Sequence, residues 1–236
     1  MKCDDIKAYI TATELEIIGR LLPLENAEVL ELGCGRAWMT RQITERYHPR
    51  RMIATEVDRI QHEKNLQIND LSGVTFVYGG AEAVDLADES IDIALMLKSL
   101  HHVAMEQMDR GLHEVARVLR PGGLLYVSEP VYDGDFNEIL KLFHDEKVVR
   151  EAAYGAICGV VVSGLFELEE QIFFNAPGHY RDFAHFEERM LNVTHIDHRI
   201  NDALYQQISA AFMRHMSDDG AHFMKPSRVD LLRKPY

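Results

Sequence analysis

Residues 28–37 of the chain read Glu-Val-Leu-Glu-Leu-Gly-Cys-Gly-Arg-Ala. The Val- and Leu-rich first half is typical of a strand that is buried on both faces. Gly33 and Gly35 then allow the backbone to turn tightly and to approach a ligand closely, and a helical pattern begins at Trp38. Since ligands of open α/β sheets bind outside the carboxyl ends of the strands, this turn is the first candidate binding site.

Short apolar runs and longer helical patterns alternate after this turn. Strands separated by helices predict a parallel sheet joined by right-handed crossovers. A helical pattern over residues 5–21 precedes them. The expected strands are 28–32, 52–55, 74–78, 91–97 and 124–128, and the expected helices are 38–47, 59–68 and 106–119.

The pattern changes after residue 130. No repeat or low-complexity linker marks a boundary, so we expect one domain over residues 1–236, with its core in 28–130 and added helices and last strands in 131–236. In this second half we expect a long helix over 135–153, a strand over 166–174, helices over 181–192 and 202–216, and a strand over 223–232.

Composition narrows the class of protein. The chain has 25 Lys and Arg against 38 Asp and Glu, a formal net charge of −13. An acidic chain repels phosphate backbones, so a nucleic-acid partner is disfavoured. Three scattered cysteines form no disulfide framework, which favours the reducing cytoplasm. The N-terminal residues lack a signal-peptide core, and the longest apolar run, 156–166, is too short to span a bilayer.

Two side chains beside the glycine turn indicate the charge of its ligand. A dinucleotide-binding turn needs a third glycine at position 38, where this chain has Trp. Glu31 would also repel a pyrophosphate, whereas a carboxylate at a strand end suits a cation. The turn therefore favours a cationic ligand over NAD or FAD.

The turn resembles the first motif of the class I S-adenosylmethionine-dependent methyltransferases, acid-x-Gly-x-Gly-x-Gly. Glu31, Gly33 and Gly35 match, and Ala37 stands where the third glycine usually falls. The resemblance, to methyltransferases of the quinone-biosynthesis type, covers residues 28–130. It implies a Rossmann-like, mostly parallel seven-stranded sheet with helices on both faces. It also implies S-adenosylmethionine as methyl donor and S-adenosylhomocysteine as product.

The same resemblance implies the remaining cofactor contacts. Glu56 takes the place of the acid that binds both ribose hydroxyls, while its rival Asp58 is typical of a helix N-cap. Gly80 replaces an Asp that helps to hold the adenine amino group. The full set implied in cofactor binding is Glu31, Gly33, Cys34, Gly35, Glu56, Val57, Gly80, Ala81, Glu82, Leu97 and Lys98.

Catalytic candidates follow two of the expected strands. His101 and His102 come after strand 91–97, and histidine titrates near neutrality as a general base must. The alternative is that they cap or pack beneath a helix. Glu129, after strand 124–128, is the third catalytic candidate, with strand-end hydrogen bonding as its alternative.

Three further side chains are candidates for contact with a small-molecule acceptor: Tyr132, His179 and Tyr180. His195 and His198 would share a helix face, but no further ligand cluster accompanies them, so we predict no metal site. A homodimer formed through the added helices is a further hypothesis.

The sequence leaves the acceptor atom open among O, N, C and S. Three other readings compete with methyl transfer. The first is a protein that binds the cofactor without turnover. The second is a nicotinamide-dependent oxidoreductase, which Trp38 and Glu31 disfavour. The third is an enzyme that uses the same cofactor for another group transfer.

Overall fold

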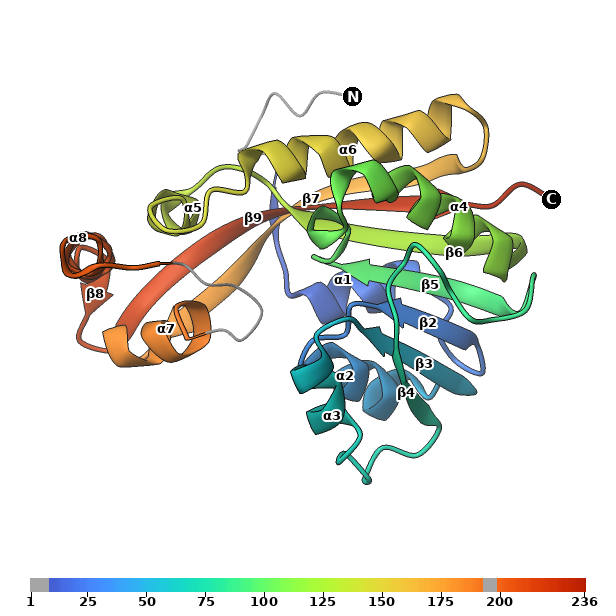
Figure 1. Cartoon of the computed structure of the whole chain (residues 1–236), viewed down its shortest axis with the longest axis horizontal. Helices are drawn as coiled ribbons and strands as arrows, with labels where there is room; N and C mark the ends of the chain where they lie inside the picture. The colour runs from blue at the N-terminus through green and yellow to red at the C-terminus, as the bar shows by residue number, and fades with distance from the viewer. Residues whose placement is uncertain (1–8, 193–198) are drawn as a thin grey trace. The chain divides into compact units, whose positions relative to one another are not determined.

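The computed structural model describes residues 9–192 and 199–236 (Figure 1). Within them, the strands form one nine-stranded sheet in the order β1-β7-β9-β6-β5-β2-β3-β4, with β8 paired to β9. The strands are β1 (Ile10–Thr11), β2 (Glu28–Leu32), β3 (Arg51–Glu56), β4 (Val74–Tyr78), β5 (Ile91–Leu97), β6 (Leu119–Pro130), β7 (Glu167–Tyr180), β8 (Met216–Ser217) and β9 (Gly220–Arg233).

Helices connect most of these strands. The α-helices are α1 (Glu14–Leu21), α2 (Trp38–Tyr47), α3 (Arg59–Asn65), α4 (Met108–Val118), α5 (Asp135–Leu140), α6 (Lys147–Val162), α7 (Phe183–Met190) and α8 (Asp202–Met213). Two short 3-10 turns, η2 (Leu100–His102) and η3 (Met105–Gln107), lie between β5 and α4. No helix among residues 9–192 and 199–236 combines the length and the apolar character needed to cross a membrane.

The central strands confirm the predicted Rossmann-like sheet. β2 pairs in parallel with both β3 and β5, β3 pairs in parallel with β4, and β5 pairs in parallel with β6. The two-residue strands β1 and β8 raise the number of strands to nine, where the sequence predicted seven. Strands this short carry no hydrophobic pattern of their own, so only tertiary pairing reveals them.

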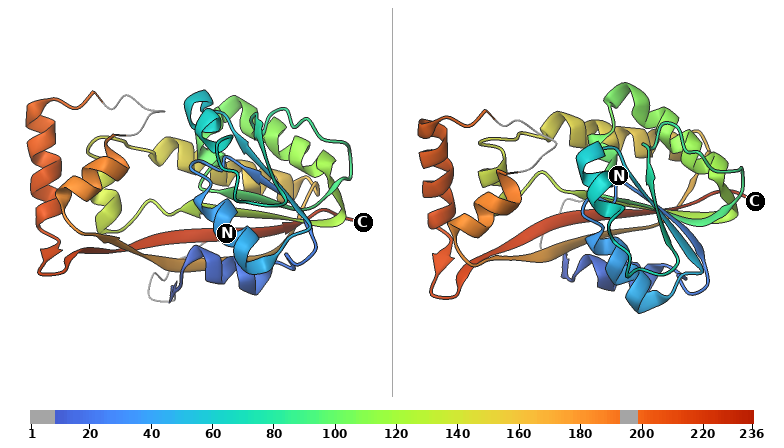
Figure 2. Two further views of the ribbon diagram at one scale, coloured as in Figure 1. Left: turned by 90° about the horizontal axis from the view of Figure 1, so that it is seen from below. Right: turned by 60° about the horizontal axis from the view of Figure 1, so that its bottom comes forward.

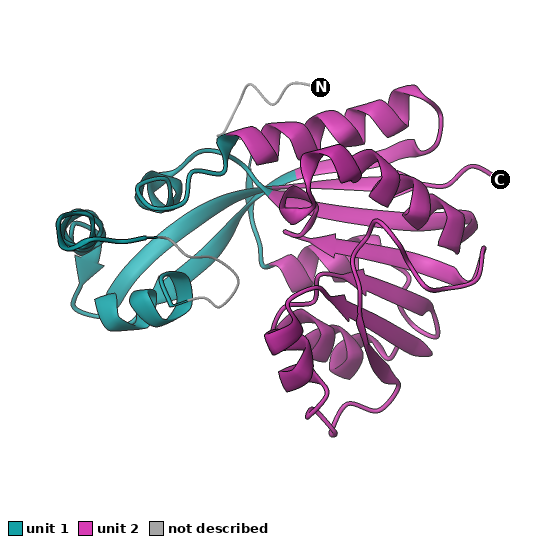
Figure 3. Ribbon diagram, in the orientation of Figure 1, with its two compact units in different colours: residues 1–13, 130–147, 173–227 teal, residues 14–129, 148–172, 228–236 magenta. Residues whose placement is uncertain are grey.

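The chain divides into two compact units (Figure 3). Unit 2 comprises residues 14–129, 148–172 and 228–236, and unit 1 comprises residues 1–13, 130–147 and 173–227. Strands β7 and β9 each contribute residues to both units. The single domain over 1–236 stays a prediction.

Unit 2 has helices on both faces of its part of the sheet (Figures 1 and 2). Leu112 of α4 and Ile157 of α6 are fully buried in one cluster with Leu30 of β2 and Leu125 of β6. Helices α1 and α2 pack against each other on the other face, where α1 buries Ile18. Burying a side chain of this size contributes about 1.5–3 kcal/mol.

Unit 1 is built around aromatic side chains from α5, α7, α8, β7 and β9. The buried Tyr180 ring lies 5.4 Å from the Phe186 ring, measured between centroids, and Phe186 lies 5.0 Å from Phe212. The members of this cluster that are fully or nearly fully buried are Ile139, Tyr180, Phe186, Ile208, Phe212, Ala221 and Phe223.

Two expected helices differ from the structure. The long helix over 135–153 is instead α5 and α6, separated by residues 141–146, because Oδ1 of Asp145 accepts a hydrogen bond from the Lys147 amide at 3.1 Å and starts α6 anew. The helix expected over 5–21 covers only residues 14–21 of the described chain. Ile10 and Thr11 pair with β7 instead, so sheet pairing overrides the local pattern there.

Candidate active site

Four charged residues stand at the carboxyl ends of neighbouring parallel strands in unit 2. Glu31 is the next-to-last residue of β2, Glu56 ends β3, Lys98 follows β5 and Glu129 lies near the end of β6. The registers of these strand pairs bring their ends to one edge of the sheet. This edge is where an open α/β sheet binds its ligand.

The glycine turn is anchored to β3 and leaves space above it. The amides of Gly33 and Cys34 donate to the Thr55 carbonyl at 3.1 and 2.8 Å. Gly33 has φ 78°, and a Cβ there would lie 2.7 Å from Cβ of Ser99. Gly35 also has a positive φ, but a Cβ there would meet nothing within 4 Å. A side chain at Gly33 would therefore clash with Ser99, whereas the space beside Gly35 is open.

Ala37 lies in the left-handed region with φ 57°, although it is buried and carries a Cβ. An L-residue in this conformation costs roughly 1–2 kcal/mol. The glycine that usually stands here would avoid that cost. The presence of Ala in place of Gly at this position therefore strains the backbone.

Asn65, at the end of α3, holds the turn from the other side. Its Nδ2 donates to the Gly35 carbonyl at 2.8 Å, and its Oδ1 accepts from Nε2 of Gln61 at 2.8 Å. The side chain is fully buried. Sequence reasoning missed Asn65, because no motif links it to a turn 30 residues earlier.

The Glu56 carboxylate is oriented by backbone donors. Its Oε2 accepts from the Gly35 amide and its Oε1 from the Asp58 amide, both at 2.8 Å. A carboxylate has about four acceptor sites, so two remain for further donors. Asp58 itself caps α3, accepting from the amides of Ile60 and Gln61 at 2.9 and 3.3 Å, which confirms the predicted N-cap.

Glu31 is a buried carboxyl group whose protonation is perturbed. Its Oε2 accepts from Oγ1 of Thr40 at 2.6 Å. Burial raises the pKa of Glu31 to about 7, against a smaller lowering by Thr40, and the negative charge of Glu56 adds to the rise. Burial also raises the pKa of the Cys34 thiol far above its usual range, so Cys34 is an uncharged part of the turn.

The loop after β4, which carries Gly80, Ala81 and Glu82, is fastened to α4 at its far end. Arg117 donates to the carbonyls of Leu86 and Val84, both at 2.8 Å. Ala81 is buried, and a Cβ at Gly80 would collide with the Glu82 carboxylate. Gly80 thus gives Glu82 room to fold back over the loop.

His101 and Glu129 form a buried pair. Nδ1 of His101 is hydrogen-bonded to Oε2 of Glu129, and Oε1 of Glu129 accepts from the Leu100 amide at 3.0 Å. Both side chains are only 3% exposed. A carboxylate acceptor at Nδ1 fixes the tautomer that carries its proton there, so Nε2 is the basic nitrogen.

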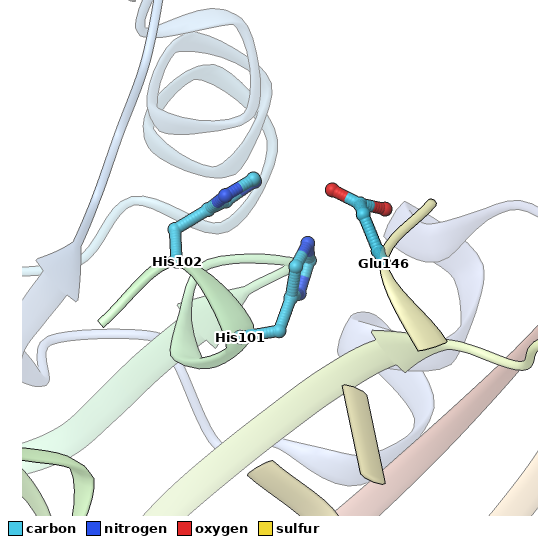
Figure 4. A group of neighbouring side chains, drawn as sticks. All are labelled: His101, His102 and Glu146. Carbon is cyan, nitrogen blue, oxygen red and sulfur yellow. The ribbon is translucent and has the colours of Figure 1, made fainter. Parts of the chain in front are cut away.

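His102 is the exposed neighbour of this pair. Figure 4 shows the two histidines side by side on the turn η2, with ring centroids 4.1 Å apart. Glu146, also labelled in Figure 4, belongs to unit 1, where its carboxylate lies 2.9 Å from Nε2 of His144. Of the two histidines singled out from the sequence, His101 is the buried one, and its ring contacts the buried Glu129 carboxylate.

The acceptor-contact candidates all belong to unit 1. Tyr180 is a core residue whose hydroxyl accepts from Nζ of Lys225 at 3.0 Å, and burial raises its pKa to about 12. The His179 ring is hydrogen-bonded to the Asp219 carbonyl at 2.7 Å. Burial, together with a hydrogen bond to Asp145, raises the pKa of Tyr132. His195 and His198 lie outside the described residues.

Residues 29–123 match a family model described as a methyltransferase domain. The glycine turn, the acid at the end of β3 and the segment after β5 all lie inside the matched region. Within residues 29–123, the chain is therefore similar to known methyltransferase domains, in agreement with the methyltransferase family that the motifs predicted.

Two curated relatives of this methyltransferase domain are named methyltransferases. The phthiotriol/phenolphthiotriol dimycocerosates methyltransferase 1 of Mycobacterium ulcerans is 33% identical over 127 residues, which are 53% of this chain and 44% of that protein. The ubiquinone biosynthesis O-methyltransferase of Rhizobium leguminosarum bv. trifolii is 34% identical over 130 residues, 51% of this chain and 48% of that protein. Each match spans less than half of the relative's length.

Solved structures extend the likeness over almost the whole chain. The YcgJ protein of Bacillus subtilis has a TM-score of 0.65 at 20% identity, covering 94% of this chain and 97% of its own. A putative methyltransferase of Bacillus halodurans has the same TM-score and identity, covering 94% and 99%. At this identity the likeness establishes that the methyltransferase domain shares their fold.

Proposed function

We propose that this chain transfers a methyl group from S-adenosylmethionine to a hydroxyl group of a small-molecule acceptor. The observation that carries the proposal is the buried His101–Glu129 pair at the sheet edge that also holds the glycine turn. The name of the Rhizobium relative, an O-methyltransferase, agrees with an oxygen acceptor. The formal net charge of −13 favours a small molecule over a nucleic acid.

The residues of the edge fit S-adenosylmethionine. The open space over Gly35 admits a ligand close to the backbone. Glu56, already oriented by two amides, keeps acceptor sites that suit the two ribose hydroxyls. The Glu31 carboxyl group suits the cationic α-amino group. Val57, Ala81 and Glu82 would then border the adenine.

His101 supplies what a hydroxyl acceptor needs. When bound, S-adenosylmethionine offers a methyl carbon already activated by the sulfonium. A hydroxyl is a weak nucleophile until it loses its proton, and Nε2 of His101 can take that proton. The Glu129 carboxylate then stabilises the imidazolium that forms, as in other carboxylate–histidine pairs. General-base catalysis of this kind contributes about 10²- to 10⁴-fold in rate.

Binding is the first test. Trp38 is the only tryptophan of the sequence and begins α2 directly after the glycine turn, so its fluorescence reports on ligands at this site. We expect millimolar S-adenosylmethionine or S-adenosylhomocysteine to change the Trp38 emission and to raise the melting temperature. If a folded chain responds to neither ligand, the proposal is wrong.

Catalysis is the second test. The chain is incubated with S-adenosylmethionine and a panel of phenols and alcohols, and matched amines serve as the comparison. Products are identified by mass. With a methylated hydroxyl product in hand, Glu129→Gln should lower kcat about 10²- to 10⁴-fold and leave cofactor affinity unchanged. His102→Asn is the matched control and should keep most of the activity. Methylation of amines alone would contradict the base role of His101.

A homodimer and a cytoplasmic location remain predictions.

A further inference from the structure

Glu14, the first residue of α1, accepts hydrogen bonds from three side chains of unit 2. Its Oε2 accepts from Nζ of Lys98 at 2.7 Å and from Oγ of Ser128 at 2.9 Å. Its Oε1 accepts from the Tyr126 hydroxyl at 2.7 Å. The Glu14 side chain is only 10% exposed. This carboxylate therefore ties α1 to the carboxyl ends of β5 and β6.

Lys98 is the cation of this group. Burial raises the pKa of Tyr126 well above its usual range, and the neighbouring charge of Glu14 raises it further, so its hydroxyl stays neutral. Ser128 is neutral as well. Lys98 is therefore the only one of the three partners of Glu14 that carries a charge, and the negative charge of Glu14 neutralises it.

Lys98 stands between the glycine turn and the catalytic pair. Its backbone is left-handed with φ 56°, and its amide donates to the Ser128 carbonyl at 2.7 Å. The next residue, Ser99, fills the space beside Gly33 and donates to the Leu32 carbonyl at 2.6 Å. His101 follows two residues later. In the proposed function, the reacting end of the methyl donor lies between these two features.

We propose that Glu14 is a positioning residue that neutralises Lys98, so that the site accepts a sulfonium cation and prefers S-adenosylmethionine to its product. The inference rests on the proposed function. The donor and the product differ in charge only at sulfur, which is cationic in the donor and neutral in the product. An uncompensated ammonium nearby repels the donor and has little effect on the product.

The test uses calorimetry to compare the binding of the two ligands to variants of this chain. Glu14→Gln can still accept hydrogen bonds, yet it leaves Lys98 uncompensated. We expect Glu14→Gln to lower the affinity for S-adenosylmethionine about tenfold relative to the affinity for S-adenosylhomocysteine, which corresponds to about 1.4 kcal/mol. The double variant Glu14→Gln with Lys98→Met should restore the wild-type ratio. Lys98→Met alone leaves an uncompensated anion and should shift the preference further toward the donor.

Glu170→Gln is the matched control. Glu170 pairs with Arg20 of the same helix α1 at 3.1 Å, so the variant removes the same charge elsewhere in unit 2. We expect it to leave the ratio of the two affinities unchanged.

Each outcome separates the two proposals. If Glu14→Gln lowers the affinities for both ligands equally, Glu14 is a purely structural residue and the inference is overturned. If Glu14→Gln does not fold, an unchanged ratio in Lys98→Met overturns it instead. A wild-type chain that binds neither ligand counts against the proposed function itself.

Discussion

Replacing Glu31 by Gln removes a buried carboxyl group while keeping its size and its ability to accept the Thr40 hydrogen bond. Glu31 is 2% exposed, and burial raises its pKa from the ordinary value of 4.5 to about 7. The folded chain therefore holds this proton more tightly than the unfolded chain does. The stability of the wild-type chain must depend on pH through this residue, and that of the variant must not.

The sign and the size follow from the two pKa values. Below the unfolded value, both states carry the proton and Glu31 costs nothing. Between 4.5 and about 7 the unfolded chain releases the proton and the folded chain keeps it, so the free energy of unfolding falls as pH rises. Above about 7 the loss is complete. It amounts to about 3 kcal/mol, since each pKa unit corresponds to about 1.4 kcal/mol.

The assay compares denaturant unfolding of the two chains from about pH 6 to about pH 8, above the sequence pI of 5.3. Far-ultraviolet circular dichroism follows the unfolding, because Trp38 is 68% exposed and its emission changes little. Other titrating groups are common to both chains and cancel in the difference. Over this range, the advantage of Glu31→Gln should grow by about 1.3 kcal/mol.

A constant difference between the two chains over this range would refute the reasoning, because it would mean that the folded chain has already released the Glu31 proton below pH 6. An advantage that shrinks with rising pH would refute it more strongly, since a carboxyl group with a raised folded pKa can only lose stability as pH rises. Thr40→Val is a useful companion, because it removes the hydrogen bond that opposes the rise in pKa. Thr40→Val should therefore enlarge the pH dependence of the free energy of unfolding.

Three further predictions concern the cofactor turn, each measured by denaturant unfolding. Asn65→Ala should cost about 1–3 kcal/mol by leaving the half-buried Gly35 carbonyl without its Asn65 donor, and a loss below about 0.5 kcal/mol would contradict this. Ala37→Gly should stabilise the chain by about 0.5 kcal/mol, because relief of the left-handed backbone outweighs one buried methyl; clear destabilisation would count against it. Asp58→Ala should cost about 0.5–2 kcal/mol and Asp58→Asn less, so equal losses would argue against capping.

The parallel core could be predicted because local pattern and tertiary role agree there. Helix α2 runs from Trp38 to Tyr47, as its pattern indicates, and strands β2, β4 and β5 keep their expected bounds. The second half was harder to predict. Residues 135–153 are helical by local pattern, yet the chain turns between α5 and α6. Unit 1 buries its aromatic cluster there, and this packing leaves no periodic mark in the sequence.

The candidate site divides in the same way. The acids and glycines of the turn could be located because each directly follows an apolar strand. Asn65 and Glu14 could not, because their contacts with Gly35 and Lys98 join residues 30 and 84 positions apart. His101 and His102 were equivalent in the sequence. Only the structure distinguishes them, since the buried Glu129 contacts one of the two rings through its carboxylate.

The place of β9 in the sheet has a consequence for synthesis on the ribosome. β9 lies between β7 and β6, although both of those strands are translated before it. Until β9 emerges, the growing chain exposes one open edge on β6 and another on β7. Open strand edges invite pairing with other chains. Translation through residue 233 is therefore the step that closes the sheet, and a chain stalled before β9 should depend on chaperones to stay soluble.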